Sequence, residues 1–171
     1  MTQEPLTLYK LIVLYMLDRV AFPLTKAQVG GFILDKEYTN FLTLQQAIAD
    51  LIDTGLVDAR SIRNRTHLVI TPEGQETLRY FENRISDAIK EEINQFFREN
   101  ELELRNEVSI LADYYKSTSG EFEAELSAKD KGINLVSVRL SVPTEEMAAA
   151  VCDNWQKKNQ EIYQYLTQKL F

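Results

Sequence analysis

The chain contains few side chains of the types that act as nucleophiles, general bases or metal ligands. It has one histidine, His67, and one cysteine, Cys152. A nucleophile–histidine pair would have to use His67, which falls in a predicted strand beside a basic turn, an improbable place for a catalytic base. A zinc site normally needs several Cys or His ligands, and the glycine patterns of nucleotide-binding loops are absent. We therefore expect no metal and no cofactor.

The remaining candidates for acid–base chemistry are Glu121, Glu123 and Glu125, which alternate along one face of a predicted strand. Paired carboxylates do such chemistry when their environments differ. Three in a row on a polar strand face are more often solvated, and Cys152, between Val151 and Asp153, is best interpreted as a small, partly buried residue. We therefore predict that the chain is not an enzyme.

Basic side chains gather between two short apolar runs, residues 56–62 and 66–70. Arg63, Asn64 and Arg65 lie between the runs, and Arg60 lies within the first. Asparagine tolerates the left-handed backbone that a tight hairpin turn requires. The pattern predicts a β-hairpin with a basic tip, and guanidinium groups at such a tip are suited to phosphate contacts.

A predicted helix precedes the hairpin. Its apolar stripe has helical spacing, and Gly55 follows it as a C-terminal cap; the stripe comprises Leu44, Ala47, Ile48, Leu51 and Ile52. Thr43 and Gln46 fit a capping box at its start. The opposite face offers Gln45, Gln46 and Ala49, of which glutamine pairs bidentately with adenine. This face has no Lys or Arg and carries Asp50, which repels phosphate.

After the hairpin, Thr71 and Pro72 have the types expected at the N-cap and first position of a further helix. Helix, glycine, basic hairpin and helix in this order resemble the winged-helix domain of bacterial transcription regulators. The phrases LIDTGLV and LVITPEG are similar to the same positions in PadR-type and MarR-type repressors, and the whole chain resembles an uncharacterised bacterial PadR-like winged-helix family of unknown function.

That resemblance implies a sequence-specific, DNA-binding transcriptional regulator. Its third helix would enter the major groove of double-stranded DNA, and its hairpin would lie on the backbone. The matching positions in this chain are Lys26, Lys36, Thr43, Gln45, Gln46, Arg60, Arg63, Asn64 and Arg65. The alternative is a winged helix that serves as a protein-interaction module and does not bind DNA.

Composition limits the other possibilities. The 171 residues carry a net charge of −7, which argues against nonspecific attraction to phosphate, but most of the acidity lies after residue 75. The apolar run over residues 11–17 is too short to span a bilayer, and it lacks the basic start and cleavage site of a signal peptide. A single cysteine fits a reducing compartment, so we expect a cytoplasmic protein with no membrane partner.

The other elements complete an α+β fold of two parts. Helices are predicted over residues 5–20, after a Thr25–Gln28 capping box, and from 72 to about 98, with a junction at 100–104. Period-two alternation over 108–114, 122–128 and 136–142 predicts a three-stranded antiparallel sheet, which a helix starting near Pro143 would cover. Residues 1–75 would form the winged helix-turn-helix, and residues 76–171 the long linking helix, the sheet and the C-terminal helix, a dimerisation or effector domain.

A homodimer is the expected assembly. The first predicted helix is apolar on more than one face, and the helix after Pro72 is longer than one small domain needs. Both features suggest a partner surface, for which the candidates are Leu11, Tyr15, Phe81 and Ile85. Nothing in the sequence identifies a small-molecule effector. The pair Gly30-Gly31 inside the second helix suggests the close approach of another helix.

Overall fold

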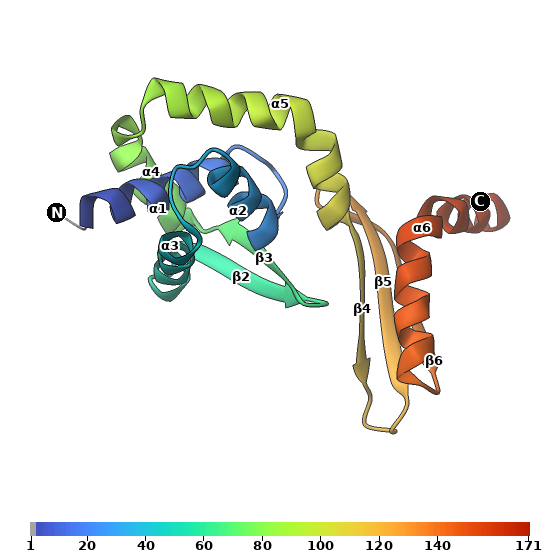
Figure 1. Cartoon of the computed structure of the whole chain (residues 1–171). Helices are drawn as coiled ribbons and strands as arrows, with labels where there is room; N and C mark the ends of the chain where they lie inside the picture. The colour runs from blue at the N-terminus through green and yellow to red at the C-terminus, as the bar shows by residue number, and fades with distance from the viewer. Residues whose placement is uncertain (1–2) are drawn as a thin grey trace. The chain divides into compact units, whose positions relative to one another are not determined.

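A computed structural model describes residues 3–171, and side chains from Pro5 onward. Over these residues the chain has a mixed α+β fold with six α-helices and two three-stranded antiparallel sheets (Figure 1). It divides into two compact units. Unit 1 comprises the chain up to Ser61 together with Arg65–Arg105, and unit 2 comprises Ile62–Asn64 together with Asn106–Phe171.

Unit 1 is built around its first helix. Its elements are α1 (Gln3–Asp18), β1 (Leu24–Thr25), α2 (Lys26–Asp35), α3 (Phe41–Asp53), β2 (Val57–Ile62), β3 (Arg65–Ile70), α4 (Pro72–Phe81), the 3-10 helix η1 (Glu82–Arg84) and α5 (Asp87–Ser109). The small sheet has the order β1-β3-β2, with Leu24 opposite Leu68 and Thr25 opposite His67. Helix α1 contacts α3, α4, η1 and β3. Its residues Leu11 to Leu17 are consequently all buried.

The local signals for α2 and the hairpin are confirmed. The Thr25 hydroxyl accepts a hydrogen bond from the Gln28 amide at 3.0 Å, while the Gln28 side chain accepts one from the Thr25 amide at 2.9 Å. This is the reciprocal capping box that the sequence predicts. Gly55 follows α3 with φ 76°, and Arg63 and Asn64 form the turn between β2 and β3 with φ 47° and 67°. Two successive positive φ values are the geometry of a type I′ hairpin turn.

The N-terminus of α3 differs from the prediction. Asn40 is the N-cap, and its side chain accepts a hydrogen bond from the Thr43 amide at 2.9 Å. The expected Thr43–Gln46 capping box is therefore wrong, because Asn40 already satisfies the free amide and lets the helix begin at Phe41. The buried face is as predicted for Leu44, Ala47, Ile48 and Leu51, and Ile52 is half-buried.

The long helix after Pro72 is interrupted. Ile85 is extended (φ −84°, ψ 126°), and the Ser86 hydroxyl accepts a hydrogen bond from the Ile89 amide at 3.2 Å, as a cap for the following helix does. Helix α5 then continues through the predicted junction at 100–104 to Ser109. The apolar face of α5, including Ile93, Phe97 and Leu104, packs into the core of unit 1. Unit 1 for this reason extends to Arg105 rather than to residue 75.

Unit 2 contains the predicted meander and its covering helix. Strands β4 (Ile110–Lys116), β5 (Phe122–Asp130) and β6 (Ile133–Val142) are antiparallel neighbours in that order, and α6 spans Glu145–Leu170. Val108, expected in the first strand, is in the last turn of α5 instead. The core of unit 2 is small: Ala112, Ala124, Leu126 and Ala128 from the sheet meet Cys152 and Trp155 from α6. The Trp155 indole donates a hydrogen bond to the Ser127 carbonyl at 3.0 Å.

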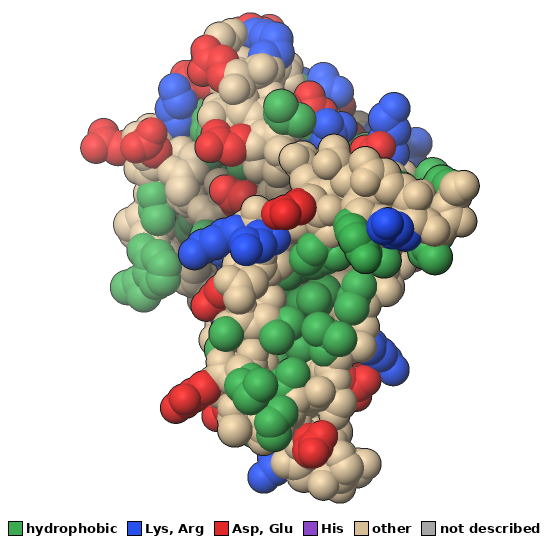
Figure 2. Space-filling view, turned by 90° about the vertical axis from the view of Figure 1, so that its right-hand side faces the viewer, with side chains coloured by type: hydrophobic (Ala, Val, Ile, Leu, Met, Phe, Trp, Pro, Cys, Tyr) green, Lys and Arg blue, Asp and Glu red, His purple; other side chains and the backbone are tan. Residues whose placement is uncertain are grey.

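Apolar side chains remain exposed on unit 2. Helix α6 packs more extensively on β4 and β5 than on β6. Leu140 is 42% exposed and Met147, expected to face the sheet, is 48% exposed. Val136 and Val138 on the same face of β6 are less buried than the residues opposite them on β5. Together with Leu140 they form what we call the β6 patch. Figure 2 shows apolar side chains gathered on the face that it draws.

Candidate nucleic-acid interface

The polar face of α3 is partly exposed. Gln46 and Ala49 are exposed, whereas Gln45 and, at the edge of the face, Thr43 are half-buried. Leu42, Gln45, Gln46 and Ala49 have the i, i+3, i+4, i+7 spacing of one helical face. Phe41 and Leu42 at the start of α3 are 59% and 79% exposed. The face thus combines two amide side chains with apolar ones and no formal positive charge.

The carboxylate expected to oppose DNA binding has a cationic partner. The Asp50 Oδ2 atom lies 3.1 Å from the Lys10 ammonium of α1, and the Gln46 amide donates a hydrogen bond to Asp50 Oδ1 at 3.1 Å. The ion pair offsets the charge that would otherwise repel a phosphate. Lys10 is a residue that sequence reasoning missed, because the pairing of α1 with α3 is a tertiary contact that no local pattern reports.

The hairpin presents basic side chains at its strands and turn. Arg60 in β2 and Arg65 in β3 are exposed, and Arg63 and Asn64 form the turn itself. Arg63 is half-buried, and its guanidinium lies 3.0 Å from Asp153 Oδ1, so its charge already has a carboxylate partner. Among the residues that the structure describes, neither Arg60 nor Arg65 is in an ion pair, so both guanidinium groups retain their charge for an external anion. Lys26, at the first position of α2, is half-buried.

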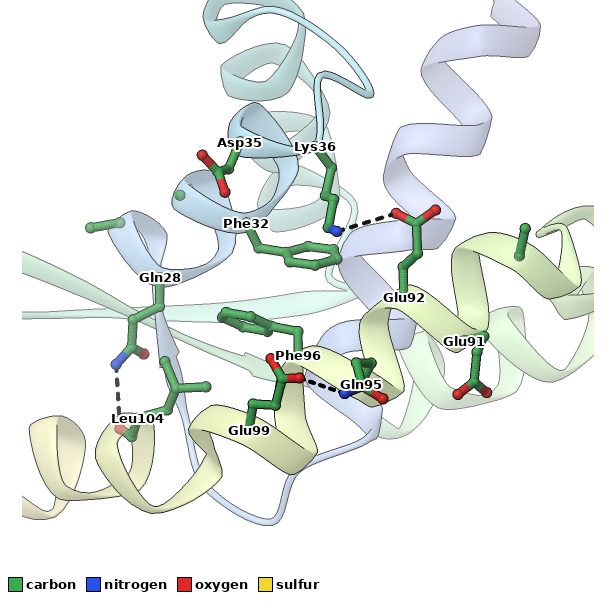
Figure 3. A pocket seen from close by; sticks show the side chains of 13 residues that line it. Gln28, Phe32, Asp35, Lys36, Glu91, Glu92, Gln95, Phe96, Glu99 and Leu104 are labelled. Carbon is green, nitrogen blue, oxygen red and sulfur yellow. Dashed lines mark hydrogen bonds and ion pairs between the residues drawn. The ribbon is translucent and has the colours of Figure 1, made fainter.

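Lys36 belongs elsewhere in unit 1. Its ammonium lies 3.7 Å from Glu92 Oε2 of α5 (Figure 3). The Tyr38 hydroxyl donates a hydrogen bond to the same oxygen at 2.6 Å. Burial, and then the hydrogen bond to Glu92, raises the pKa of the Tyr38 phenol, so Tyr38 stays a neutral donor. Lys36 therefore has a carboxylate partner within unit 1, and its contact with DNA stays a prediction.

The residues predicted for a dimer interface are mostly interior. Leu11, Tyr15 and Ile85 are between 1% and 3% exposed and belong to the core of unit 1. Helix α1 is apolar on several faces because other elements of the same unit surround it, and no second chain is needed to cover it. Of the four candidates only Phe81, 37% exposed, is at the surface, where the Arg84 guanidinium lies 4.9 Å from its ring centre.

The candidates for acid–base chemistry lie in different surroundings. His67 is buried in β3. Cys152 is fully buried, more deeply than expected. Arg139 pairs with Glu125 at 2.6 Å and with Glu123 at 3.6 Å on the outer face of the second sheet. No cluster of three or more potential metal ligands occurs within residues 3–171.

Comparisons with known proteins identify a family whose function is unknown. A family model described as a domain of unknown function (DUF4364) matches residues 9–170, so the chain belongs to that family. Comparisons with curated proteins and with solved structures found no match. Across the described residues, none of the helices has the length and apolar composition needed to cross a bilayer.

Proposed function

We propose that this DUF4364 chain is a sequence-specific DNA-binding transcriptional regulator, with α3 in the major groove and the β2–β3 hairpin along the backbone. The order α1-β1-α2-α3-β2-β3 with the sheet order β1-β3-β2 supports this, since these are the elements and the order that we expect of a winged helix. The observation that carries the proposal is the pairing of Lys10 with Asp50 beside Gln45 and Gln46. It leaves amide groups, rather than an uncompensated carboxylate, to meet base edges.

Selection from a pool of random duplexes by mobility shift tests this proposal. We expect enrichment of a defined site by the whole chain at low salt. Replacing Arg60 and Arg65 together by alanine should weaken binding to all duplexes alike and reduce the salt slope by about 2 units, since each phosphate contact contributes roughly 0.9. Arg79→Ala, an exposed arginine in the last turn of α4, is the control and should change neither.

The contribution of α3 has a separate signature. Gln45→Ala should relax base preference at one position of the selected site while leaving the salt slope unchanged, because a base contact releases no counterions. Failure of the whole chain to retain any duplex at low salt would reject DNA binding.

A second candidate, a protein-interaction module, is favoured by the exposure of Phe41 and Leu42 and by the lack of Lys or Arg on α3. Exposed apolar side chains at one end of a helix are suited to an apolar partner. This candidate predicts that the chain binds amphipathic helical peptides and not duplex DNA. Leu42→Asp should abolish peptide binding, whereas the arginine pair in the hairpin should be dispensable.

Homodimerisation is part of the proposal, but with the β6 patch of unit 2 as the interface. β6 is an edge strand whose outer backbone groups have no strand partner within residues 3–171. An open edge beside an apolar patch is a template for pairing with a second copy. A two-fold axis would bring the same patch from each chain together. Such a dimer would read an inverted repeat.

Light scattering tests this assembly. A dimer has a mass of about 40 kDa, twice the 19.8 kDa of one chain, and Leu140→Asp should shift it to a monomer. Leu102→Asp, at an exposed leucine of α5 in unit 1, is the matched control and should remain dimeric. A wild-type mass of one chain at micromolar concentration would reject the dimer.

A further inference from the structure

A cavity of about 760 Å³ lies in unit 1 between α2 and α5 (Figure 3). Its volume falls within the range of small-molecule sites, which is roughly 300–1,000 Å³. All of its lining residues come from these two helices and the turn that follows α2. The cavity is separate from the exposed face of α3, so the inference drawn from it does not depend on the proposed DNA contact.

The base of the cavity is apolar and aromatic. The rings of Phe32 and Phe96 lie 4.8 Å apart between centres, with an angle of 37° between their planes. Leu104 closes one end, where its carbonyl accepts a hydrogen bond from the Gln28 side chain at 3.3 Å (Figure 3). Phe32 and Leu104 are buried, which fixes this base in place. An apolar base with ring faces favours a flat or aromatic ligand body.

The rim of the cavity is negatively charged. Of its four carboxylates, Glu92 is neutralised by Lys36 and Glu91 is paired with Arg98 at 2.7 Å. Asp35 is in no ion pair within the described residues, and Glu99 accepts a hydrogen bond from the neutral amide of Gln95. Two carboxylates without a cationic partner among the described residues attract a cation and disfavour an anion.

An exposed glycine forms part of the wall of the cavity. Gly31 lies inside α2 and lines the cavity, and a Cβ atom at this position would meet no other atom within 4 Å. Glycine inside a helix costs about 1 kcal/mol relative to alanine. No neighbouring atom of the described residues requires this glycine, in contrast to Gly74, whose Cβ would overlap the Leu56 carbonyl oxygen. A molecule that packs directly against the backbone of α2 would require it.

We propose that this cavity binds an organic cation with an aromatic or similarly flat apolar body. The body packs on Phe32 and Phe96 and against the bare backbone at Gly31, and the ammonium group lies between Asp35 and Glu99. Nucleotides, sugar phosphates and carboxylic acids are excluded by the charge of the rim.

Ligand titration followed by NMR of the whole chain tests the proposal, with phenethylammonium and benzyltrimethylammonium as probes. Phenylacetate and 2-phenylethanol are the matched anionic and neutral compounds. We expect saturable binding of the two cations, with shifts confined to α2 and α5. Asp35→Asn and Glu99→Gln should each weaken binding about fivefold, the factor that corresponds to loss of ~1 kcal/mol for a partly exposed ion pair. Glu101→Gln, an exposed carboxylate of α5 outside the lining, should have no effect.

Filling the cavity gives the decisive variant. Gly31→Leu places its side chain in open space, so the protein should fold with an unchanged or raised melting temperature and lose cation binding at least tenfold. Gly31→Ala places a smaller side chain in the cavity and should weaken cation binding less than Gly31→Leu does. The proposal is overturned if neither cation binds, if phenylacetate or 2-phenylethanol binds as well as the cations, or if Gly31→Leu folds and binds the cations normally.

Discussion

The two units bury their apolar surface in very different ways. In unit 1, helix α1 is enclosed by other elements, and large side chains such as Ile12, Leu14 and Met16 are fully buried at its centre. In unit 2, one helix covers one face of a sheet, and three of the six core residues are alanines. Small cores are marginal because little apolar area leaves water on folding. Unit 2 therefore depends strongly on Trp155, the largest side chain of its core.

The largest expected effect on this difference between the units comes from truncating Trp155, the central side chain of unit 2. Trp155→Ala should destabilise unit 2 by about 3–5 kcal/mol, the usual cost of a large aromatic deletion, and should unfold it. Unit 1 should stay folded. Hydrogen exchange measured unit by unit checks this, with Ile12→Ala as the counterpart: its effect should be confined to unit 1. If Trp155→Ala removed protection from hydrogen exchange in both units, the two units would not be independent in stability, contrary to this prediction.

The second-largest expected loss of stability comes from a substitution of Gly74 in unit 1. A Cβ at Gly74 would overlap the Leu56 carbonyl oxygen, which also accepts a hydrogen bond from the Thr71 amide. Gly74→Ala should therefore cost about 3 kcal/mol, the upper range for overpacking, as measured by denaturant unfolding. Gly31→Ala, made in open space, should instead stabilise by up to ~1 kcal/mol. Equal effects of the two substitutions would show that α4 tolerates displacement.

The two units also differ at a helix cap, where substitutions should cost less stability than those above. Thr71 of unit 1 is buried; its hydroxyl accepts from the Gly74 amide at 3.0 Å and donates to the Gly55 carbonyl at 2.7 Å. Thr144 of unit 2 is exposed and caps the Met147 amide at 3.2 Å. Thr71→Ala should cost about 2 kcal/mol and Thr144→Ala about 0.5 kcal/mol, because only the first leaves buried groups without partners. Thermal unfolding of the two variants measures the difference, and a larger loss at Thr144 would contradict it.

The smallest expected effect on stability is a pH dependence caused by Tyr115 on the outer face of the second sheet. Hydrogen bonding to Glu123, then burial and the bond to Glu125, raises the pKa of Tyr115 to about 12. A pKa raised in the folded state contributes stability that is present below the ordinary value near 10 and is lost as pH rises from there through about 12. The tyrosinate absorbance should show a late step that Tyr115→Phe removes and Glu123→Gln moves to lower pH. A titration in which Glu123→Gln changes nothing would contradict this arrangement.

Local signals in the sequence predicted much of the fold. The period-two pattern located all three strands of unit 2, and the Thr25–Gln28 pair and Gly55 marked the ends of helices correctly. These signals work because each reports a backbone need of its own segment. The break at Ile85 and Ser86 escaped prediction because apolar spacing continues across it, and only the cap formed by Ser86 shows where α5 restarts.

The candidate sites were harder to predict because they depend on contacts between distant segments. The apolar character of α1 suggested a second chain, yet its cover comes from α3, α4, η1 and β3. The ion pairs Lys10–Asp50 and Lys36–Glu92 likewise join separate helices.

One signal for the cavity was present in the sequence, namely the glycine pair in α2, which was interpreted as a helix contact. That interpretation holds for Gly30 alone, because a Cβ there would lie 3.6 Å from Leu44 Cδ2 of α3. Gly31 faces open space instead. Two adjacent glycines with different surroundings look identical in a sequence, since the neighbours that distinguish them come from other helices.

Trp155 is the single tryptophan of the chain, and it lies entirely inside unit 2. Its indole fluorescence consequently reports on that unit alone, while far-ultraviolet circular dichroism reports on the helices of both. Following the two signals through one denaturation separates the unfolding of the units without any label. Because the indole is also desolvated and hydrogen-bonded to a backbone carbonyl, its emission should shift to longer wavelength as soon as α6 leaves the sheet.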